Sequence, residues 1–354
     1  MNKQLYTIHL NFSGPLHLGS NKLDYGQSET RLRSDTLYSA IFQTWALIGK
    51  EGWIPTAEHP QPNFSISSGF PYYFDEQRYH HFFPRPYGRL FSHNKKQEQQ
   101  FIDQRKALKK IEYLHEDAFM EWCKNGEIQL NTKLLKGAFY AKHLPEEKLY
   151  YSQVSPRVKV AREDGEDATP FSVDRLYFYK RQRKKEEKTA SPNAHAGMYF
   201  LFYGDEQALK RLTMALKILQ DEGLGTDRKV GHGQFTFDVE TFSTPDWSGN
   251  ASINLSLLLP DSADWVKQHA VEQESGGYSL MERGGWITTP GLNSYRKNML
   301  HFFEEGSVFG QPCDGIHENG TVKDVYPKES LTFEQQPHPV WRVGKGILFP
   351  VNIS

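Results

Sequence analysis

The chain reads Gly223-Leu224-Gly225-Thr226-Asp227-Arg228-Lys229-Val230-Gly231-His232-Gly233-Gln234-Phe235 between a helical pattern and a strand pattern. This short loop holds four glycines, two fixed cations and one histidine. Glycines permit positive φ and let backbone N–H groups approach an anion. Arg228 and Lys229 add positive charge suited to a phosphate. The loop alone fits either a flexible turn or a clamp on a nucleic-acid backbone, with RNA as the expected ligand.

The segments around the loop predict regular elements. Asp205 is a good helix cap, and Gly223 is a typical residue just past a helix end. Gly197 to Tyr203 reads as a strand before this helix, and Gln234 to Phe242 alternates like a half-buried strand. The helix between them carries an apolar stripe of leucines at three- and four-residue spacings: Leu209, Leu212, Leu216 and Leu219.

The N-terminal segment predicts the matching half of the same unit. Leu5 to Phe12 reads as a strand, and Phe64 to Tyr73 as a later one. Between them, Ser34 is expected to cap a helix that stops near Gly49 or Gly52. The apolar face of this helix is expected to hold Leu37, Ile41, Trp45 and Ile48. The order strand, helix, strands, strand, helix, strand is that of a ferredoxin-like unit.

We therefore predict an α+β protein of two tandem ferredoxin-like (RRM-like) βαββαβ domains. The first is assigned to residues 1–245, with an insertion at about 82–195 that includes a charged helical region from Gln97 to Cys123. Thr244 to Asn250 is expected to link it to a second domain at residues 251–354. Strands of the second domain are expected at Ile253–Leu259, Trp286–Thr289, Met299–Phe303 and Trp341–Phe349.

Composition narrows the class of protein. The chain has 354 residues and a net charge of −1, so it is not a uniformly basic nucleic-acid coat. Cys123 and Cys313 lack CxxC spacing, so neither a disulfide nor a zinc site is expected. We expect a cytoplasmic protein, since neither a signal core nor an apolar run of membrane-spanning length is present.

Chemistry-bearing motifs are few. The sequence contains no HExxH, P-loop or GxSxG motif, so we expect no catalytic site, no cofactor and no metal. Asp75, Glu76, His80 and His81 cluster in sequence, which turn composition explains. Cations gather around Gly137, at Lys133, Lys136, Lys142 and His143, and again from Arg175 to Lys188. The second run fits a solvated hairpin tip or a direct RNA contact.

Several ordered segments together resemble one family, the RAMP superfamily of RNA-binding proteins in CRISPR systems. Three of them support the superfamily: Gly14 to Gly19, Arg33 to Ala40, and the loop Gly223 to Phe235. Three more are similar to the fourth Csm subunit of type III-A effector complexes: Arg157 to Arg175, Phe303 to Phe309, and His338 to Gly346. The resemblance spans nearly the whole chain.

The resemblance implies a role rather than a chemistry. Members of the family cap the 5′ end of the guide RNA (crRNA) and hold its repeat-derived tag. They also dock the large palm-domain subunit and join the backbone RAMP subunits, so that target RNA is met indirectly. Their fold is two ferredoxin-like domains with a β-hairpin thumb. No membrane partner is implied.

RNA-binding residues are assigned by position on this pattern. The first choice is the glycine-rich loop, with Gly225, Arg228, Lys229, Gly231 and His232. The others are His17, Gly19 and Ser20 after the first strand, Arg31, Arg33 and Ser34 at the first helix, Lys133, Lys136 and Gly137 beside the thumb, and Arg157 and Arg175 along the guide path. Each also has a structural interpretation as a cap, turn or solvated charge.

Further residues and alternatives stay open at this point. Tyr177 or Phe178 could stack on a base, although such aromatics are more often core residues. Glu304 and Glu305 fit a metal pair less well than a hydrogen-bonded strand end. One rival function is a metal-independent endoribonuclease that uses His17 and His232 as an acid–base pair. Another is a structural bridge with little RNA contact.

Overall fold

The computed structural model describes residues 3–19, 26–92, 98–159, 168–180, 194–243, 245–273, 276–287, 295–327 and 339–353. Several predictions fall outside these ranges. They concern Ser20, Thr244, Thr289 and His338, and the basic run from residue 181 to residue 188. Within the described ranges, no helix is long and apolar enough to cross a membrane.

A mixed sheet forms the centre of the molecule, in the order β11-β1-β10-β3-β4-β5-β7-β6. Its first four strands pair antiparallel, with Ile8 of β1 opposite Phe200 of β10 and Val239 of β11. The short β2 also pairs with β10. The strands of this first half are β1 (Gln4–Phe12), β2 (Ser65–Ile66), β3 (Phe70–Phe74), β10 (His195–Gly204) and β11 (Phe235–Thr241). With one helix after β1 and one after β10, this part has the predicted strand–helix order.

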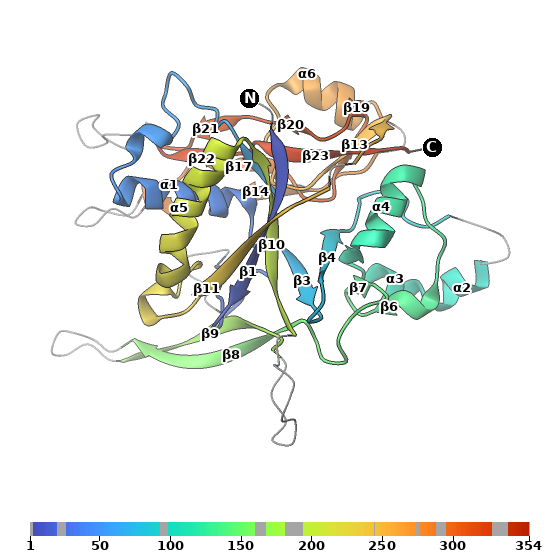
Figure 1. Ribbon diagram of the computed structural model, residues 1–354, viewed down its shortest axis with the longest axis horizontal. Coiled ribbons are helices and arrows are strands. Elements are labelled where there is room, and N and C mark those ends of the chain that lie inside the picture. Colours follow the sequence, from blue (N-terminus) through green and yellow to red (C-terminus); the bar gives the residue numbers. More distant parts are fainter. Residues whose placement is uncertain are drawn as a thin grey trace.

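Two helices, α1 (Ser34–Leu47) and α5 (Glu206–Glu222), lie side by side against this sheet (Figure 1). The predicted apolar stripes are the buried faces of both helices, except that Leu209 and Ile48 are only partly buried. They pack on alternate residues of β1, among them Ile8 and Leu10. Because strand side chains alternate between faces, the intervening His9 points to the opposite side of the sheet.

The predicted helix ends are partly right. Asp205 caps α5 by accepting a hydrogen bond from the Ala208 N–H at 2.7 Å, and Gly223 ends the helix. The prediction for Ser34 is wrong, because Arg33 occupies the N-cap position and Ser34 is the first helical residue. The Ser34 hydroxyl instead accepts a hydrogen bond from the Leu257 N–H, so contact with the C-terminal part replaces capping.

The inserted region packs beside β4 at the other end of the sheet (Figure 1). The predicted helical region is interrupted, since a strand separates its helices. Its core includes Phe119 of α4, which stacks on Phe83 of β4 with ring centroids 4.3 Å apart. The elements are β4 (Tyr79–Pro84), α2 (Glu98–Asp103), α3 (Arg105–Lys109), β5 (Tyr113–His115), α4 (Glu116–Asn125), η3 (Thr132–Leu134), β6 (Leu135–Lys136) and β7 (Phe139–Tyr140).

A long hairpin of β8 (Tyr150–Lys159) and β9 (Thr169–Phe178) extends from the same side of the molecule as the glycine-rich loop (Figure 1). Its register places Gln153 opposite Arg175 and Arg157 opposite Phe171. Leu176 on β9 exchanges backbone hydrogen bonds with Leu16 at 2.8 and 2.9 Å. The hairpin is thereby attached to the segment that follows β1.

The C-terminal part centres on a four-stranded sheet in the order β18-β13-β23-β20. The predicted segment Trp341–Phe349 forms two strands, and the predicted strand from Ile253 ends at Asn254. The overall class is α+β, as predicted; the tandem ferredoxin-like arrangement and the domain boundaries stay predictions. The remaining elements are η1 (Glu51–Trp53), η4 (Arg228–Val230), β12 (Ser248–Gly249), β13 (Ala251–Asn254), α6 (Ala263–Val266), η5 (Lys267–Val271), β14 (Leu280–Arg283), β15 (Trp286–Ile287), β16 (Tyr295–Arg296), β17 (Leu300–Phe303), β18 (Val308–Phe309), β19 (Cys313–Asp314), β20 (His317–Asn319), β21 (Val322–Asp324), β22 (Trp341–Val343) and β23 (Gly346–Val351).

Candidate nucleic-acid interface

The glycine-rich loop between α5 and β11 docks on the segment that follows β1. The Gly233 N–H donates to the Pro15 carbonyl at 2.9 Å, and the Thr226 N–H donates to the His17 carbonyl at 3.1 Å. Within the loop, the Leu224 N–H donates to the Gly233 carbonyl at 2.9 Å. The glycine-rich loop and the segment after β1 are therefore joined through their backbones.

Close backbone approach explains why this loop needs glycine. Gly225 has a φ of +88°, and a Cβ on it would lie 2.3 Å from the His17 carbonyl oxygen. A Cβ on Gly233 would lie 1.9 Å from the Leu224 carbonyl oxygen. Both positions combine positive φ with a contact that no other residue type allows. Gly231, in contrast, has open space around it, so only its positive φ favours glycine.

A pocket of about 210 Å³ lies between this loop and the first turns of α1. The structure brings five predicted site residues to its lining: Gly19, Arg31, Arg33, Gly225 and Arg228. The hydroxyl and amide groups of Thr36, Ser39 and Gln43 add hydrogen-bonding capacity along the α1 side.

Arg228 and Lys229 have no ion-pair partner among the described residues, unlike the four other predicted arginines, Arg31, Arg33, Arg157 and Arg175. Lys229 is exposed, and Arg228 is half-buried at the pocket. Neither side chain donates a hydrogen bond to a carboxylate within the part of the chain that the structure describes. Their charges are therefore available to an incoming phosphate, which a guanidinium can bind through two parallel hydrogen bonds.

Arg157 and Arg175, on the hairpin, are both paired with Asp227 of the glycine-rich loop. The Arg157 guanidinium lies 3.3 Å from one Asp227 carboxylate oxygen, and Arg175 lies 2.8 Å from the other. Arg175 is buried, and Arg157 is 30% exposed. One carboxylate shared by two arginines leaves a net positive charge on the hairpin and ties the hairpin to the loop.

Arg31 and Arg33 converge on the buried carboxylate of Glu305, at 3.1 Å and 2.5 Å. The two guanidinium groups outweigh burial and keep the pKa of Glu305 below its usual value. Arg33 also pairs with Glu29 at 3.0 Å and lies 3.6 Å from Glu304. This arrangement argues against Glu304 and Glu305 as a metal pair, since two arginines already occupy the acidic site.

The arginine-rich contact extends to Asp35, at the start of α1. Arg283 binds both Asp35 carboxylate oxygens at 3.0 Å, and the buried Arg342 donates to the same carboxylate. Although burial opposes ionisation, these two cations hold the pKa of Asp35 well below its usual range. Because Arg283 and Arg342 lie in the C-terminal part, this cluster fixes that part against α1.

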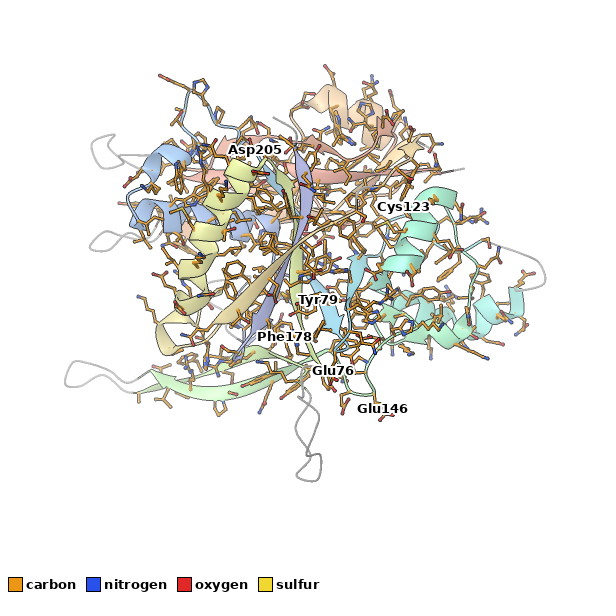
Figure 2. The ribbon with its side chains drawn as sticks, viewed as in Figure 1. Glu76, Tyr79, Cys123, Glu146, Phe178 and Asp205 are labelled. Atoms are coloured by element: carbon orange, nitrogen blue, oxygen red, sulfur yellow. The ribbon has the colours of Figure 1, made fainter. Side chains whose placement is uncertain are left out.

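Three of the candidate residues occupy buried or partly buried positions. The Ser34 side chain is fully buried and bonded to Leu257, so it does not face the pocket. His17 is 1% exposed, and its Nδ1 donates to the Asp174 carbonyl at 2.6 Å. Phe178 stacks on the core residue Phe12 with ring centroids 5.1 Å apart, at the foot of the hairpin (Figure 2).

The remaining predicted residues lie around the base of the hairpin. His232 is half-buried, and burial together with the nearby Arg175 lowers its pKa. Lys136 and Gly137 line a second pocket of about 730 Å³, together with Tyr150 at the start of β8, and Lys133 is exposed in η3. Tyr177 stacks on Tyr151 of the opposite strand with centroids 5.3 Å apart.

Two important residues were missed at the sequence level. Asp227 lies inside the glycine-rich loop, where a single acidic residue among cations indicates an ion pair. Arg283 reaches the pocket from β14, 248 positions away from its partner Asp35. No local pattern marks Arg283, because only the packing of the two parts brings it to α1.

Comparison with known proteins finds similar chains. Residues 248–351 match the model of the CRISPR Csm4 C-terminal domain family. Over 363 residues the chain is 24% identical to the CRISPR system Cms protein Csm4 of Streptococcus thermophilus, covering 98% of this chain and 99% of that protein. A protein with the same description from Methanocaldococcus jannaschii is 29% identical over 183 residues, 45% of each chain.

A solved structure shares the fold. A chain in the crystal structure of a Csm1–Csm4 cassette in complex with cA4 aligns with a TM-score of 0.51 and 18% sequence identity, covering 100% of this chain and 99% of that one. The shared fold and these matches make the chain similar to Csm4 proteins of CRISPR systems. These matches support a Csm4-like protein, which confirms the resemblance seen in the sequence.

Proposed function

We propose that this chain is the noncatalytic subunit of a type III-A CRISPR interference complex that binds guide RNA and caps its 5′ repeat-derived tag. The observation that carries the proposal is the pair of unpaired cations, Arg228 and Lys229, on a backbone-locked loop beside the pocket. Most other arginines near this pocket are neutralised by carboxylates. Charge that is left free at one defined place suits a phosphate group.

The pocket offers complementary groups for a single strand. Phosphates fix the register of a bound strand, while hydrogen bonds and stacking recognise sugars and bases. In our proposal, Arg228 and Lys229 bind backbone phosphates. Thr36, Ser39 and Gln43 then face riboses or base edges in the pocket. Asp227 holds the loop against the hairpin, so the binding site and the hairpin move as one unit.

The partners in this proposal are protein as well as RNA. The fold neighbour comes from a Csm1–Csm4 cassette, and we propose an equivalent contact of this chain with the large palm-domain subunit. A second surface would join the backbone RAMP subunits, and target RNA would be met through the guide. The setting would be the cytoplasm and the role antiviral defence, with no chemistry of its own.

The geometry of the two histidines favours binding over RNA cleavage. A general acid–base pair needs both imidazoles to reach the same scissile group. His17 is buried, and its Nδ1 is engaged with a backbone carbonyl. The lowered pKa of His232 reduces its protonated fraction at neutral pH, which weakens it as a general acid.

The test is RNA binding by the purified full chain across a salt series, using guide RNA with and without its 5′ tag. We expect tag-dependent retention of intact RNA. Arg228→Ala/Lys229→Ala should weaken binding and lower the salt slope by about 1.4, since each phosphate contact on a single strand contributes about 0.7. The matched control is Lys210→Ala/Lys217→Ala, which removes two exposed cations from α5.

The outcomes separate the alternatives. If both double variants weakened RNA binding equally, the two loop cations would contribute only general positive charge. That result would contradict the proposal. Cleavage within the repeat, abolished in His17→Ala and His232→Ala, would indicate the endoribonuclease instead. Guide retention and salt slope unchanged in Arg228→Ala/Lys229→Ala, measured in the assembled complex, would support a structural bridge.

A further inference from the structure

A second cluster of polar side chains lies away from the RNA-binding pocket, where β4 meets the start of α4. His80 lies on β4, His115 ends β5 and Glu116 begins α4. The pairing of Phe82 with His115 brings the two strands together. Glu76 and Tyr79, labelled in Figure 2, mark the turn that leads into β4. Nothing in the proposed RNA site uses these residues.

The three side chains are spaced like metal ligands. One donor atom from each of His80, His115 and Glu116 lies within 4.8 Å of the other two. His80 Nδ1 and His115 Nε2 are 3.2 Å apart. Two imidazole nitrogens bound to one tetrahedral Zn²⁺ are separated by about 3.3 Å, because each Zn–N bond is about 2.0–2.1 Å long. Among the described residues, no other group of three such side chains meets this spacing.

Each of the three side chains also has the outer partner that metal ligands require. Asp75 Oδ2 lies 2.8 Å from His80 Nε2, and Asp117 Oδ2 lies 3.3 Å from His115 Nδ1. His115 Nδ1 also accepts a hydrogen bond from the Asp117 N–H at 3.3 Å, and metal binding at Nε2 would replace this bond by one from a protonated Nδ1 to the Asp117 carboxylate. His81 Nδ1 lies 2.8 Å from Glu116 Oε2. A carboxylate on the far nitrogen orients a metal-bound imidazole and raises its basicity. The Asp75 carboxylate is itself fixed by the backbone N–H groups of the turn.

The guanidinium group of Arg78 lies beside His80 and Glu116. Arg78 Nη2 is 3.4 Å from His80 Nδ1, and Arg78 Nη1 is 3.9 Å from Glu116 Oε1. The Arg78 side chain is 54% exposed, so it can rotate into solvent and vacate the site. Positive charge beside the unshared electron pairs of a histidine and a carboxylate marks the cluster as attractive to cations.

We propose that His80, His115 and Glu116 bind a divalent transition metal, with Zn²⁺ as the expected ion. Two imidazoles and one carboxylate form a donor set that Zn²⁺ accepts in tetrahedral sites. The fourth position is open to water or to His143, whose exposed ring stacks on His80 at 5.1 Å. Bound metal would join β4 to the start of α4 and so fasten the inserted region to the central sheet.

The test uses the full-length chain without an affinity tag, after bound metal has been removed with a chelator. Equilibrium dialysis against Zn²⁺ should give a single bound ion and a higher melting temperature, and Co²⁺ should give the visible absorption of a tetrahedral site. Glu116→Gln keeps the shape of the side chain and should lower Zn²⁺ affinity about 10- to 100-fold. Arg78→Ala should raise Zn²⁺ affinity severalfold by removing the competing cation.

The control is His301→Asn, which removes an exposed histidine paired with Glu282 on another strand. It should leave Zn²⁺ binding unchanged. Absence of bound Zn²⁺ from the wild-type chain would overturn the proposal, because hydrogen bonds alone would then account for the cluster. Equal Zn²⁺ affinities of the wild-type chain, Glu116→Gln and Arg78→Ala would also overturn it. Neither result depends on RNA binding, so this proposal stands or fails separately.

Discussion

Two groups of cations lie at or beside the same pocket, and they differ in whether carboxylates neutralise them. Arg33 and Arg283 reach buried or half-buried carboxylates from both parts of the chain. Arg228 and Lys229, on the glycine-rich loop, have no such partner among the described residues. The first group is committed to holding α1 against the C-terminal part, and the second is available to a ligand. Under the proposed function, an arginine is suited to bind RNA when no carboxylate neutralises its charge, whatever its position in the sequence.

The largest expected effect comes from breaking the committed group. Asp35→Asn leaves Arg283 and Arg342 without their buried counter-charge, so we expect a loss of about 3–5 kcal/mol in the free energy of unfolding. Urea denaturation of both chains measures this difference. Arg228→Ala is the contrasting variant and should change stability by less than about 0.5 kcal/mol. Similar losses in the two variants would contradict the division into two groups.

A smaller effect is expected from the loop that carries the free charges. Gly225→Ala forces a Cβ against the His17 carbonyl oxygen at a residue with a φ of +88°. We expect a stability loss of about 1–3 kcal/mol and weaker binding of tagged guide RNA. Gly231→Ala, where a Cβ meets nothing within 4 Å, is the matched control for positive φ. Equal losses of stability in Gly225→Ala and Gly231→Ala would show that the close approach of Gly225 to the His17 carbonyl does not contribute.

The comparison can be sharpened by converting paired cations into unpaired ones. Asp227→Asn removes the carboxylate that neutralises Arg157 and Arg175. We expect a stability loss of about 1–2 kcal/mol and a steeper salt dependence of RNA binding, because more positive charge faces the strand. Salt-dependent binding isotherms provide the measurement. An unchanged salt slope would place the hairpin arginines outside the RNA path.

The smallest expected effect concerns a cation beside the committed group. Burial and the nearby Arg342 lower the pKa of Lys297 to about 8. Since the unfolded chain keeps its usual lysine pKa of about 10.4, it binds more protons between these values, and stability should rise with pH across that window. Lys297→Met should remove about 1 kcal/mol of this rise, after allowance for the partial exposure of the side chain.

Thermal unfolding between pH 7.5 and 10.5 gives this slope for both chains. Lys267→Met, at a highly exposed lysine on η5, serves as the control and should keep the wild-type slope. If Lys297→Met kept the wild-type dependence of stability on pH, groups other than Lys297 would be responsible for the rise between pH 7.5 and 10.5.

Local patterns predicted the elements that local physics governs. The leucine stripe and the Asp205 cap predicted α5, and glycine content predicted a loop with positive φ at Gly223 and Gly225. The short-range signal failed at Ser34, because its hydroxyl bonds to Leu257 rather than to its own helix. It also failed between Gln97 and Cys123, where β5 interrupts the helices to pair with β4.

The sequence by itself determined the likeness to Csm4 proteins, the glycine-rich loop and the cations that this loop contains. Order of motifs and backbone preference are properties of the chain alone. Only the tertiary structure decided which cations are free, since Glu305 and Arg283 reach their partners Arg33 and Asp35 from 272 and 248 positions away. An ion pair depends on distance and burial, and both are fixed only when distant segments pack together.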